Sequence, residues 1–417
     1  MKVLGIITEY NPMHKGHVYH LNESKRITGS DYVVCVMSGN FIQRGEPAII
    51  NKWARAKCAL LSGVDLVIEL PLVFAMSSAE YFAFGAVKLL DSLNVVDCIS
   101  FGSESGELKY IETISEILVN EPSEFKEILK SCITAGYSFP SAREKALKKY
   151  ITEVLRKDIP DSIVSTPNNI LGIEYMKALK KLNSTIRPYT IKRLNNQYNT
   201  PHLTGEISSA TAIRNYIFSG KNLYTTEVKN SLPETSYKIL IDEYESGRAP
   251  LSSANFDLIM LSNLRRMKLS DIAKLPYVVE GLEYKIKECA ENCGTIQELI
   301  SSIKSRRYTA TRIQRILYHS LTGLTSQELN TFMENGGPQY IRVLGFNDKG
   351  RNLLSAIREK CTLPLVTKTA DLKKSNNILA ARMLEIEATA TDTYVLGYAN
   401  SLWRKAGQEY TQNVIRV

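Results

Sequence analysis

The chain has 417 residues, of which 44% are hydrophobic and 23% are charged, and this composition excludes a largely disordered protein. Its 23 glycines and 14 prolines are too few for a collagen-like or low-complexity chain. A net charge of +9 favours a polyanionic partner, although a basic surface that serves only solubility gives the same excess.

Short β-rich apolar runs alternate with helical segments over the first hundred residues. The sequence predicts strands at 3–8, 32–37, 65–70 and 95–102, and helices at 16–27, 51–62 and 78–92. Buried strands joined by helices indicate an α/β fold with a Rossmann-like parallel sheet. Because ligands of such sheets bind at the carboxyl ends of the strands, segments 8–20, 38–50 and 102–105 should meet at one edge.

The rest of the chain has a mostly helical pattern. Its elements are expected at about 107–165 (a helical insertion), 185–192 (a fifth strand), 208–219 (a short helix), and 340–345 and 394–397 (two late strands). We therefore predict two domains. Residues 1–222 hold the parallel sheet, and residues 223–417 form a mostly α-helical, basic C-terminal domain.

The lengths of the apolar runs indicate the cellular compartment, and the number and spacing of the cysteines indicate whether a metal is bound. No uninterrupted apolar stretch reaches the ~18–20 residues of a membrane span, and the N-terminus has no signal-cleavage pattern, so we expect a cytoplasmic protein. An odd number of cysteines, several of them in apolar segments, favours free buried thiols. Cys289 and Cys293 lie four residues apart, but no second pair or nearby histidine completes a tetrahedral site, so no protein-bound metal is expected.

A histidine-rich segment follows the first predicted strand. Residues 11–17 (NPMHKGH) open the first helix, where backbone N–H groups and the positive end of the helix dipole suit phosphate groups. Gly16 permits close approach, and two imidazoles can donate hydrogen bonds to a transferring phosphoryl group. An isolated HxGH is often a chance match, but its place between strand and helix favours a phosphate site.

This segment resembles the HxGH signature of the nucleotidyltransferase superfamily. There the two histidines contact the phosphates of ATP while the α-phosphate is attacked and pyrophosphate leaves, so the resemblance implies catalytic roles for His14 and His17. It also implies an ATP-binding loop made of Ile7, Thr8, Glu9, Tyr10, Asn11, Pro12, Met13, His14, Lys15, Gly16, His17, Val18, Tyr19 and His20.

A second signature of that superfamily has a counterpart near the end of the predicted sheet domain. Residues 207–214 read ISSATAIR, and the resemblance implies ATP contacts for Ser208, Ser209 and Arg214. Hydroxyls and N–H groups at a helix start, together with an arginine, form a suitable phosphate clamp. The alternative is a capped helix whose arginine points to water.

Narrower motifs, in the same order along the chain, resemble the tRNA(Met) cytidine acetate ligase family. They lie at 38–48, 101–104, 167–175 and 191–193, and the resemblance covers the full length, most densely over 1–215. It implies a Rossmann-like nucleotidyltransferase domain that binds ATP, followed by the mostly α-helical domain as the tRNA-binding part.

The resemblance also implies a reaction. Such a ligase adenylates acetate with ATP and transfers the acetyl group to N4 of the wobble cytidine of elongator tRNA(Met). ATP contacts are implied for Gly102, Arg193 and Asn168, with Asn169 as the adjacent alternative. Two other functions stay open: a small-molecule adenylyltransferase of the same superfamily, and a tRNA-binding protein whose ATP site is not catalytic.

The polar loop after the second strand offers further candidates. Arg44 can hold a phosphate or the acetate carboxylate in a bidentate manner, or form a surface salt bridge. Glu46 is a candidate for Mg²⁺, which is expected with ATP, although a solvated carboxylate is the simpler interpretation. Glu69, at the end of the third strand, is another carboxylate near this edge, and a structural hydrogen bond explains it at least as well as a role in ligand binding.

A basic stretch in the C-terminal half is the main candidate for RNA binding. Residues 300–315 contain no acidic side chain, and a solvated basic helix face is the alternative interpretation. The candidates, which combine phosphate contacts with an aromatic ring for stacking, are Lys304, Arg306, Arg307, Tyr308, Arg312 and Arg315. His202 and His319 are expected to be structural.

Overall fold

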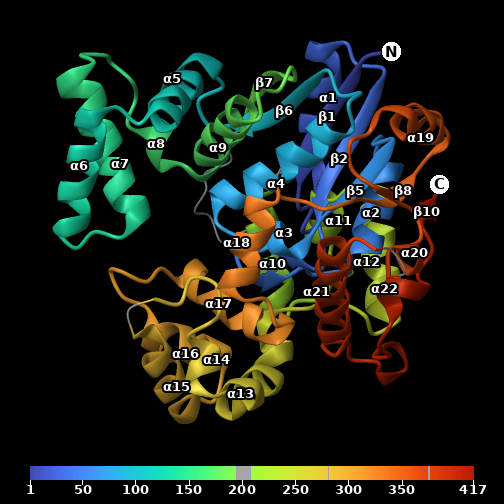
Figure 1. Cartoon of the computed structure of the whole chain (residues 1–417). Helices are drawn as coiled ribbons and strands as arrows, with labels where there is room; N and C mark the ends of the chain where they lie inside the picture. Colours follow the sequence, from blue (N-terminus) through green and yellow to red (C-terminus); the bar gives the residue numbers. More distant parts are fainter. Residues whose placement is uncertain (194–207, 280, 374–375) are drawn as a thin grey trace.

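A mixed β-sheet with helices on both faces forms the centre of the molecule (Figure 1). The structure, a computed structural model, describes residues 1–193, 208–279, 281–373 and 376–417. Within them the strands run in the order β10-β8-β5-β2-β1-β6-β7, with β9 beside β8. Their bounds are β1 Val3–Thr8, β2 Tyr32–Ser38, β5 Leu66–Leu70, β6 Cys98–Ser103, β7 Arg187–Lys192, β8 Ile341–Phe346, β9 Leu365–Val366 and β10 Ile415–Arg416, while β3 Phe41–Ile42 and β4 Glu46–Pro47 form a separate ribbon.

The α/β fold predicted from the sequence is confirmed. Strands β1, β2, β5, β6 and β7 pair in parallel and coincide with the predicted strands to within three residues at each end. The strand expected at 340–345 is β8, but it runs antiparallel to β5. The prediction of a strand at 394–397 is wrong: Tyr394 lies in the last turn of α21 (Ile378–Val395), and its hydroxyl donates to the carbonyl of Ala48 at 2.7 Å.

Helices cover the two faces of the sheet with separate apolar cores. One core packs α1, α2, α10, α11 and α12 on the sheet, and the other packs α3, α4, α5, α9 and most C-terminal helices on the opposite face. The bounds on the first face are α1 Lys15–Thr28, α2 Lys52–Leu61, α10 Ala210–Phe218, α11 Thr226–Ser231 and α12 Glu234–Glu245. On the second face the first four helices are α3 Leu72–Ala75, α4 Ala79–Ser92, α5 Leu108–Asn120 and α9 Pro167–Lys181.

The segment expected as a helical insertion is helical and projects as a lobe at the left of Figure 1. Beyond α5 it contains α6 Ser123–Thr134, α7 Phe139–Lys149 with a π-helical turn at Tyr150–Val154, and α8 Ser162–Ser165. The remaining helices are α13 Asp257–Arg266, α14 Leu269–Ile272, α15 Leu282–Asn292, α16 Ile296–Ile303, α17 Ala310–Thr322, α18 Ser326–Glu334, α19 Asp348–Lys360, α20 Thr369–Lys373 and α22 Gln408–Thr411, with 3-10 turns at Ser253–Phe256 and Ser401–Trp403.

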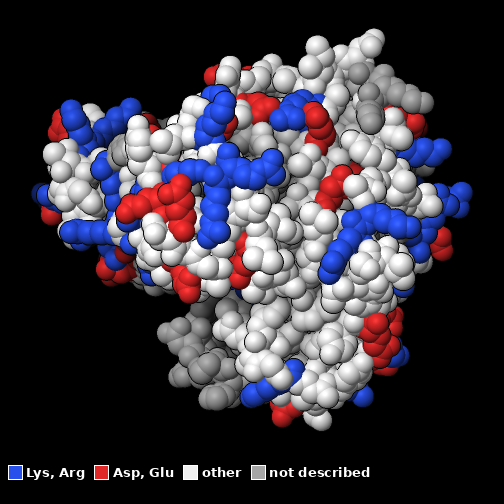
Figure 2. Space-filling view, turned by 90° about the horizontal axis from the view of Figure 1, so that it is seen from below, with Lys and Arg blue, Asp and Glu red and all other residues white. Residues whose placement is uncertain are grey.

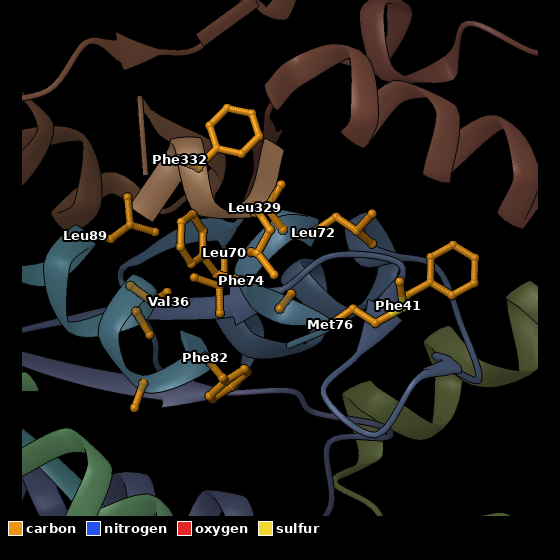
Figure 3. Packing of buried hydrophobic residues seen from close by; sticks show 14 of the residues in the cluster. Val36, Phe41, Leu70, Leu72, Phe74, Met76, Phe82, Leu89, Leu329 and Phe332 are labelled. Carbon is orange, nitrogen blue, oxygen red and sulfur yellow. The ribbon is translucent and has the colours of Figure 1, made fainter. Parts of the chain in front are cut away.

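The C-terminal half packs directly on the sheet and its helices. Figure 3 shows Leu329 and Phe332 of α18 above Leu70 and Phe74, and all four belong to one buried cluster. Strands β8 and β10 from the same half extend the sheet beyond β5. The division at residue 222 stays a prediction, and the two parts share both a sheet and a core.

A buried ion network ties the C-terminal half to the edge of the sheet. The Nζ atom of Lys52 lies 2.6 Å from Glu69, 2.7 Å from Glu409 and 3.1 Å from Glu387. Arg342 on β8 lies 2.6 Å from Glu69 and also contacts Glu409. Each of these side chains is at most 4% exposed. Glu69 is therefore structural, which was one of its two predicted roles.

Three carboxylates face two cations in this network, and the carboxylates differ in ionisation. Burial opposes the charge of Glu69, but Arg342 and Lys52 outweigh burial and lower the pKa of Glu69 to about 2. Burial and the neighbouring Glu69 raise the pKa of Glu387 to about 7. Glu387 therefore takes up a proton near neutral pH, while Glu69 stays ionised.

The loop after β2 rests on this network. The side-chain oxygen of Asn40 accepts from the backbone N–H of Lys52 at 2.9 Å, and its amide donates to Thr391 at 3.2 Å. The guanidinium of Arg55 donates to the carbonyls of Ser38, Gly39 and Ile50. These bonds hold the loop in place at the carboxyl edge of the sheet, where the predicted ligand site lies.

Candidate active site

A cavity of about 480 Å³ opens at the carboxyl ends of β1, β6 and β7. Most of the residues predicted to bind ATP line it, together with the acetate candidate. These are Ile7, Thr8, Glu9, Tyr10, Asn11, His14, Gly16, His17, Tyr19, His20, Arg44, Gly102, Asn168, Arg193, Ser208, Ser209 and Arg214. Of the described residues, the predicted contacts Pro12, Met13, Lys15, Val18 and Asn169 are not part of its lining.

The two histidines of the HxGH segment hold each other at the start of α1. The Nδ1 atom of His14 caps the helix by accepting from the N–H of Gly16 at 3.1 Å, and Nδ1 of His17 accepts from the N–H of His14 at 3.2 Å. The rings stack with centroids 3.7 Å apart. Because both Nδ1 atoms accept backbone hydrogen bonds, the neutral rings carry their proton on Nε2, as donors.

Both imidazoles are neutral at physiological pH. Burial, with Arg193 and Arg214 nearby, lowers the pKa of His14 to about 3. Burial, with His14 and Arg193 nearby, lowers the pKa of His17 well below its usual range. A neutral Nε2–H donor can stabilise a phosphate oxygen without a proton being transferred.

We expect His14 and His17 to stay neutral down to pH 5 in the ligand-free protein. The measurement is two-dimensional NMR of protein with 15N-labelled histidines, with urea-unfolded protein, in which histidines titrate near pH 6.5, as the reference. Below that pH the unfolded chain binds protons that folded His14 does not, so its contribution to folding stability falls as the pH falls. Imidazolium signals from either residue at pH 5 would contradict this assignment.

The ends of β6 and β7 form a second wall, and they distinguish Asn168 from Asn169. Asn168 lines the cavity, and its side-chain oxygen accepts from Arg193 at 3.0 Å. Asn169 is fully buried and its side chain accepts from the backbone N–H of Glu104 at 3.0 Å, which holds the turn after β6. Asn168 is thus the asparagine placed to meet a ligand.

Gly102 brings this wall close to α1. A Cβ atom at Gly102 would lie 3.3 Å from Cγ of Arg193 and 3.9 Å from the ring of His20. The Nε2 atom of His20 is buried, and no hydrogen-bond partner is found for it among the described residues. A larger residue at 102 would narrow the space where these polar groups meet a ligand.

The second superfamily signature lies opposite the HxGH segment. Ser209 caps α10 by accepting from the N–H of Ala212 at 3.2 Å, and Arg214 donates to the carbonyl of Asn11 at 2.7 Å. Ser208 and Ser209 both line the cavity with Arg214. Arg214 therefore faces the cavity rather than open water, while Ile207 and His202 lie outside the described residues.

The loop 43–46 closes the cavity on the side of the C-terminal half. Gln43 and Arg44 line the cavity, and the backbone N–H of Gln43 donates to the carboxylate of Glu9 at 2.8 Å. On its other side the loop lies against α17, where Arg315 donates to the carbonyl of Gln43 at 3.3 Å. Gln314 donates to Glu46 at 3.0 Å, so Glu46 is engaged with α17.

The predicted RNA-binding residues fall into two groups, those that are bonded within the protein and those that are exposed. Arg312 donates to the carbonyl of Tyr277 at 2.7 Å, and Arg315 lies over the Tyr277 ring at 5.3 Å, so both are partly used within the protein. Lys304, Arg306 and Arg307 are exposed, and Tyr308 is half-buried. Figure 2 views the molecule from below, and in it Lys and Arg side chains form a broken band across the upper half of the picture, interrupted by acidic groups.

The close contact at Gly45 predicts a large effect of a single methyl group. Gly45 has φ +76°, and an added Cβ would lie 2.5 Å from the backbone nitrogen of Arg315. Gly45→Ala should destabilise the protein by about 1–3 kcal/mol more than Gly220→Ala. Gly220 is the matched control because it has φ +79° but nothing within 4 Å. Denaturant unfolding measures both variants, and equal losses would contradict the packing of this loop.

No metal-binding cluster is present in the part of the chain that the structure describes: no three His, Cys, Asp or Glu side chains there are placed to hold an ion. The cysteines are free thiols, and Cys289 and Cys293 are both buried. No helix within the described ranges is long and apolar enough to cross a membrane.

Comparison with known proteins gives the family. The profile of the HIGH nucleotidyl transferase family matches residues 1–409. A tRNA(Met) cytidine acetate ligase from Acetivibrio thermocellus is 53% identical over 416 residues, and one from Halothermothrix orenii is 44% identical over 427, in both cases over all of each chain. The chain belongs to the tRNA(Met) cytidine acetate ligase family.

A solved structure of this ligase family agrees over its whole length. The crystal structure of Thermotoga maritima TmcAL bound with alpha-thio ATP covers all of both chains with a TM-score of 0.92 at 38% identity. The apo form of the same protein gives a TM-score of 0.94. The family predicted from the motifs, its ligase activity and its nucleotidyltransferase fold are thus confirmed.

The sequence analysis assigned no role to part of the cavity wall, although two of its residues lie in the motifs at 101–104 and 167–175. Phe82, Phe101 and Tyr175 line the cavity but lie on an apolar helix, a strand and another helix. Their spacing is that of ordinary core residues, so only the tertiary structure distinguishes them. The sequence identified Gln43 as a polar loop residue but did not indicate that its backbone N–H bonds to the carboxylate of Glu9.

Proposed function

We propose that the chain catalyses ATP-dependent acetylation of N4 of the wobble cytidine in elongator tRNA(Met), through an acetyl-adenylate, in the cytoplasm. ATP binding is supported by the ATP analogue in the Thermotoga maritima relative. The observation that carries the proposal is the stacked pair of neutral imidazoles beside Arg214 at the start of α1. Such donors suit charge that develops on a phosphoryl group.

In the first step an oxygen of acetate attacks the α-phosphorus of ATP, and the bond to the β-phosphate oxygen breaks. The Nε2–H groups of His14 and His17 donate to the equatorial oxygens of the α-phosphate. Arg214, with the N-terminus of α10 capped by Ser209, holds the leaving pyrophosphate. Arg44 at the cavity rim holds the acetate carboxylate before attack.

The nucleoside of ATP occupies the wall formed by β6 and β7. Gly102 permits its close approach, and Asn168 and Arg193, already bonded to each other at 3.0 Å, offer donors to the ribose and base. Mg²⁺ bound with ATP would neutralise charge on the triphosphate. The described residues supply no three-ligand cage, so the phosphates themselves would hold most of that ion.

In the second step the N4 amine of cytidine attacks the acetyl carbonyl, and AMP leaves. The exposed candidates for the tRNA backbone are Lys304, Arg306 and Arg307, with Tyr308 for stacking. Arg312 and Arg315 also add positive charge for the tRNA backbone, but their side chains are bonded within the protein, to the carbonyls of Tyr277 and Gln43 respectively.

The test is ATP–pyrophosphate exchange measured with and without acetate and with and without elongator tRNA(Met). Exchange that requires acetate, followed by transfer of labelled acetate to the tRNA, is the expected result. Exchange with a phosphorylated small molecule instead of acetate would favour an adenylyltransferase. Exchange absent under all four conditions, with tRNA still bound, would favour a binding protein with a non-catalytic ATP site.

A further inference from the structure

The cavity wraps over the edge of the sheet and so has two chemically different halves. Along β6, Gly102 faces α1, with His20 within 3.9 Å of its Cβ position, whereas Phe101 faces α9, with its ring 5.6 Å from that of Tyr175. Both Phe101 and Gly102 line the cavity. Since neighbouring residues of a strand point to opposite faces, the cavity must extend to both sides of the sheet.

Strand β1 shows the same alternation. The hydroxyl of Thr8 lies 3.0 Å from the sulfur of Cys35, which belongs to the core on the α1 face. Ile7 packs against the core on the opposite face, and both Ile7 and Thr8 line the cavity. The half on the α1 face holds the histidines and Arg214, and the proposed reaction assigns it to ATP.

The other half, here called the aromatic half, is lined by Ile7, Phe82, Phe101, Leu171 and Tyr175. These side chains come from the strands β1 and β6 and the helices α4 and α9. Planar, apolar walls of this kind suit a nucleic-acid base that has been turned out of its stack.

One carboxylate, Glu9, lies between the two halves. One of its oxygens accepts from the N–H of Gln43 at 2.8 Å, and its main-chain carbonyl accepts from Arg55 at 2.7 Å, so its position is fixed. Its charge is felt by Arg214 on the ATP side and by Tyr175 in the aromatic half. Burial raises the pKa of Glu9 although Arg214, Arg44 and Arg55 oppose the rise.

We propose that the aromatic half binds the wobble cytosine and that Glu9 accepts a hydrogen bond from its N4 amine and then takes the proton released on acetylation. This inference rests on the proposed function and names the substrate base and the acceptor of the proton. A carboxylate is the natural partner of the cytosine N4 amine. Uracil presents an oxygen at the same position, which Glu9 repels.

Acetate is a poorer occupant of this half, because its own carboxylate would face Glu9 across apolar walls. During transfer, the N4 nitrogen forms a bond to the acetyl carbon and the bond from that carbon to the phosphate oxygen breaks. AMP leaves with the electron pair of that bond, and the N4 proton passes to the carboxylate of Glu9. No further reactant is required.

The decisive experiment compares Glu9→Gln with wild type in each half-reaction separately. Single-turnover transfer of acetate to tRNA should slow by a factor that is about 30-fold or more greater than any loss in acetate-dependent ATP–pyrophosphate exchange. The transfer rate of the wild type should fall at acidic pH as Glu9 is protonated, and this fall should be absent in the variant. The groups whose charge acts on Glu9 are Arg44, Arg55 and Arg214, with Tyr175 on its other side, and none of these titrates in that acidic range. The histidines of the same cavity have lowered pKa values, about 3 for His14 and about 4 for His20, and all of them are kept in Glu9→Gln. Only a fall that the wild type shows and the variant loses is therefore assigned to Glu9.

Binding gives a second readout that does not depend on turnover. Anticodon stem–loops with cytidine or with uridine at the wobble position should differ in affinity for the wild type, and Glu9→Gln should lose that preference. Glu9→Asp, which keeps the carboxylate, should retain the preference and the pH dependence. Glu107→Gln, an exposed carboxylate outside the cavity, is the matched control and should behave as the wild type.

The outcomes separate this inference from the proposed function. If Glu9→Gln lowers exchange and transfer in parallel, Glu9 belongs to the ATP half and the inference is wrong. If transfer by the variant equals that of the wild type, the inference is also wrong while the proposed function stands. If the wild type itself shows no acetate-dependent exchange, it is the proposed function that fails.

Discussion

His17→Ala should lower acetate-dependent ATP–pyrophosphate exchange by about 100- to 1,000-fold while leaving the affinity for tRNA unchanged. The imidazole of His17 is stacked on His14, and its Nδ1 atom is already occupied by a backbone N–H, so its Nε2–H is committed to the cavity. Alanine removes that donor and also the second acceptor of the helix cap. Tyr10, whose ring lies 5.0 Å from that of His17, would lose its neighbour as well.

The control for this variant is Asn22→Ala, an exposed substitution further along the same helix. It should leave exchange within twofold of the wild type. Filter binding or fluorescence titration with elongator tRNA(Met) measures the second half of the expectation. Persistence of full exchange in His17→Ala would show that the reacting phosphate lies elsewhere in the cavity.

Lys52→Met should reduce the free energy of unfolding by about 3–5 kcal/mol, because it removes one cation from a buried network of three carboxylates. Lys52 and its partners are at most 4% exposed, so water cannot replace the lost charge. Arg342 alone would then face Glu69, Glu387 and Glu409. Denaturant unfolding at pH 7 is the measurement, and a loss below 1 kcal/mol would contradict the network.

Two glutamate variants provide a matched comparison within this network. Glu69 is firmly ionised, with a pKa of about 2, whereas Glu387, with a pKa of about 7, is partly protonated at neutral pH. Glu387→Gln should therefore cost less stability than Glu69→Gln. Its cost should rise as the pH is lowered from 8 to 6, because the folded wild type then gains stability by taking up a proton that the unfolded chain does not bind, and the amide variant lacks this gain.

The sequence was sufficient to predict the parallel strands and to place the HxGH segment at the edge where the cavity lies, because both follow local rules. Strands such as 32–37 are short apolar runs between helices, and the HxGH segment lies at a helix start. The antiparallel pairing of β8 with β5 could not be predicted, since the two strands are more than 270 residues apart and nothing local encodes their pairing. The same applies to Lys52, whose charged partners at 342, 387 and 409 are visible only in three dimensions.

For the candidate site, which stays a prediction, the sequence pointed to cavity-lining residues where chemistry marks the residue type. His14, His17 and Arg214 are unusual at a helix start or in a short motif, whereas Phe101 and Tyr175 have the same sequence pattern as core residues. The choice between Asn168 and Asn169 required the direction of one helical turn at the start of α9. It is decided by the bond from Glu104 to Asn169, which a sequence of adjacent asparagines cannot reveal.

The place of β8 in the sheet sets the order in which a nascent chain can mature. When a ribosome has made the first 222 residues, the edge of β5 is open, and Lys52 and Glu69 have neither Arg342 nor Glu409 beside them. Strand β8 can pair with β5 only after residue 346 has emerged, and the ion network can form only after residue 409. The cavity loop above that network is therefore assembled last, so that a catalytically complete molecule exists only once nearly all of the chain has been synthesised.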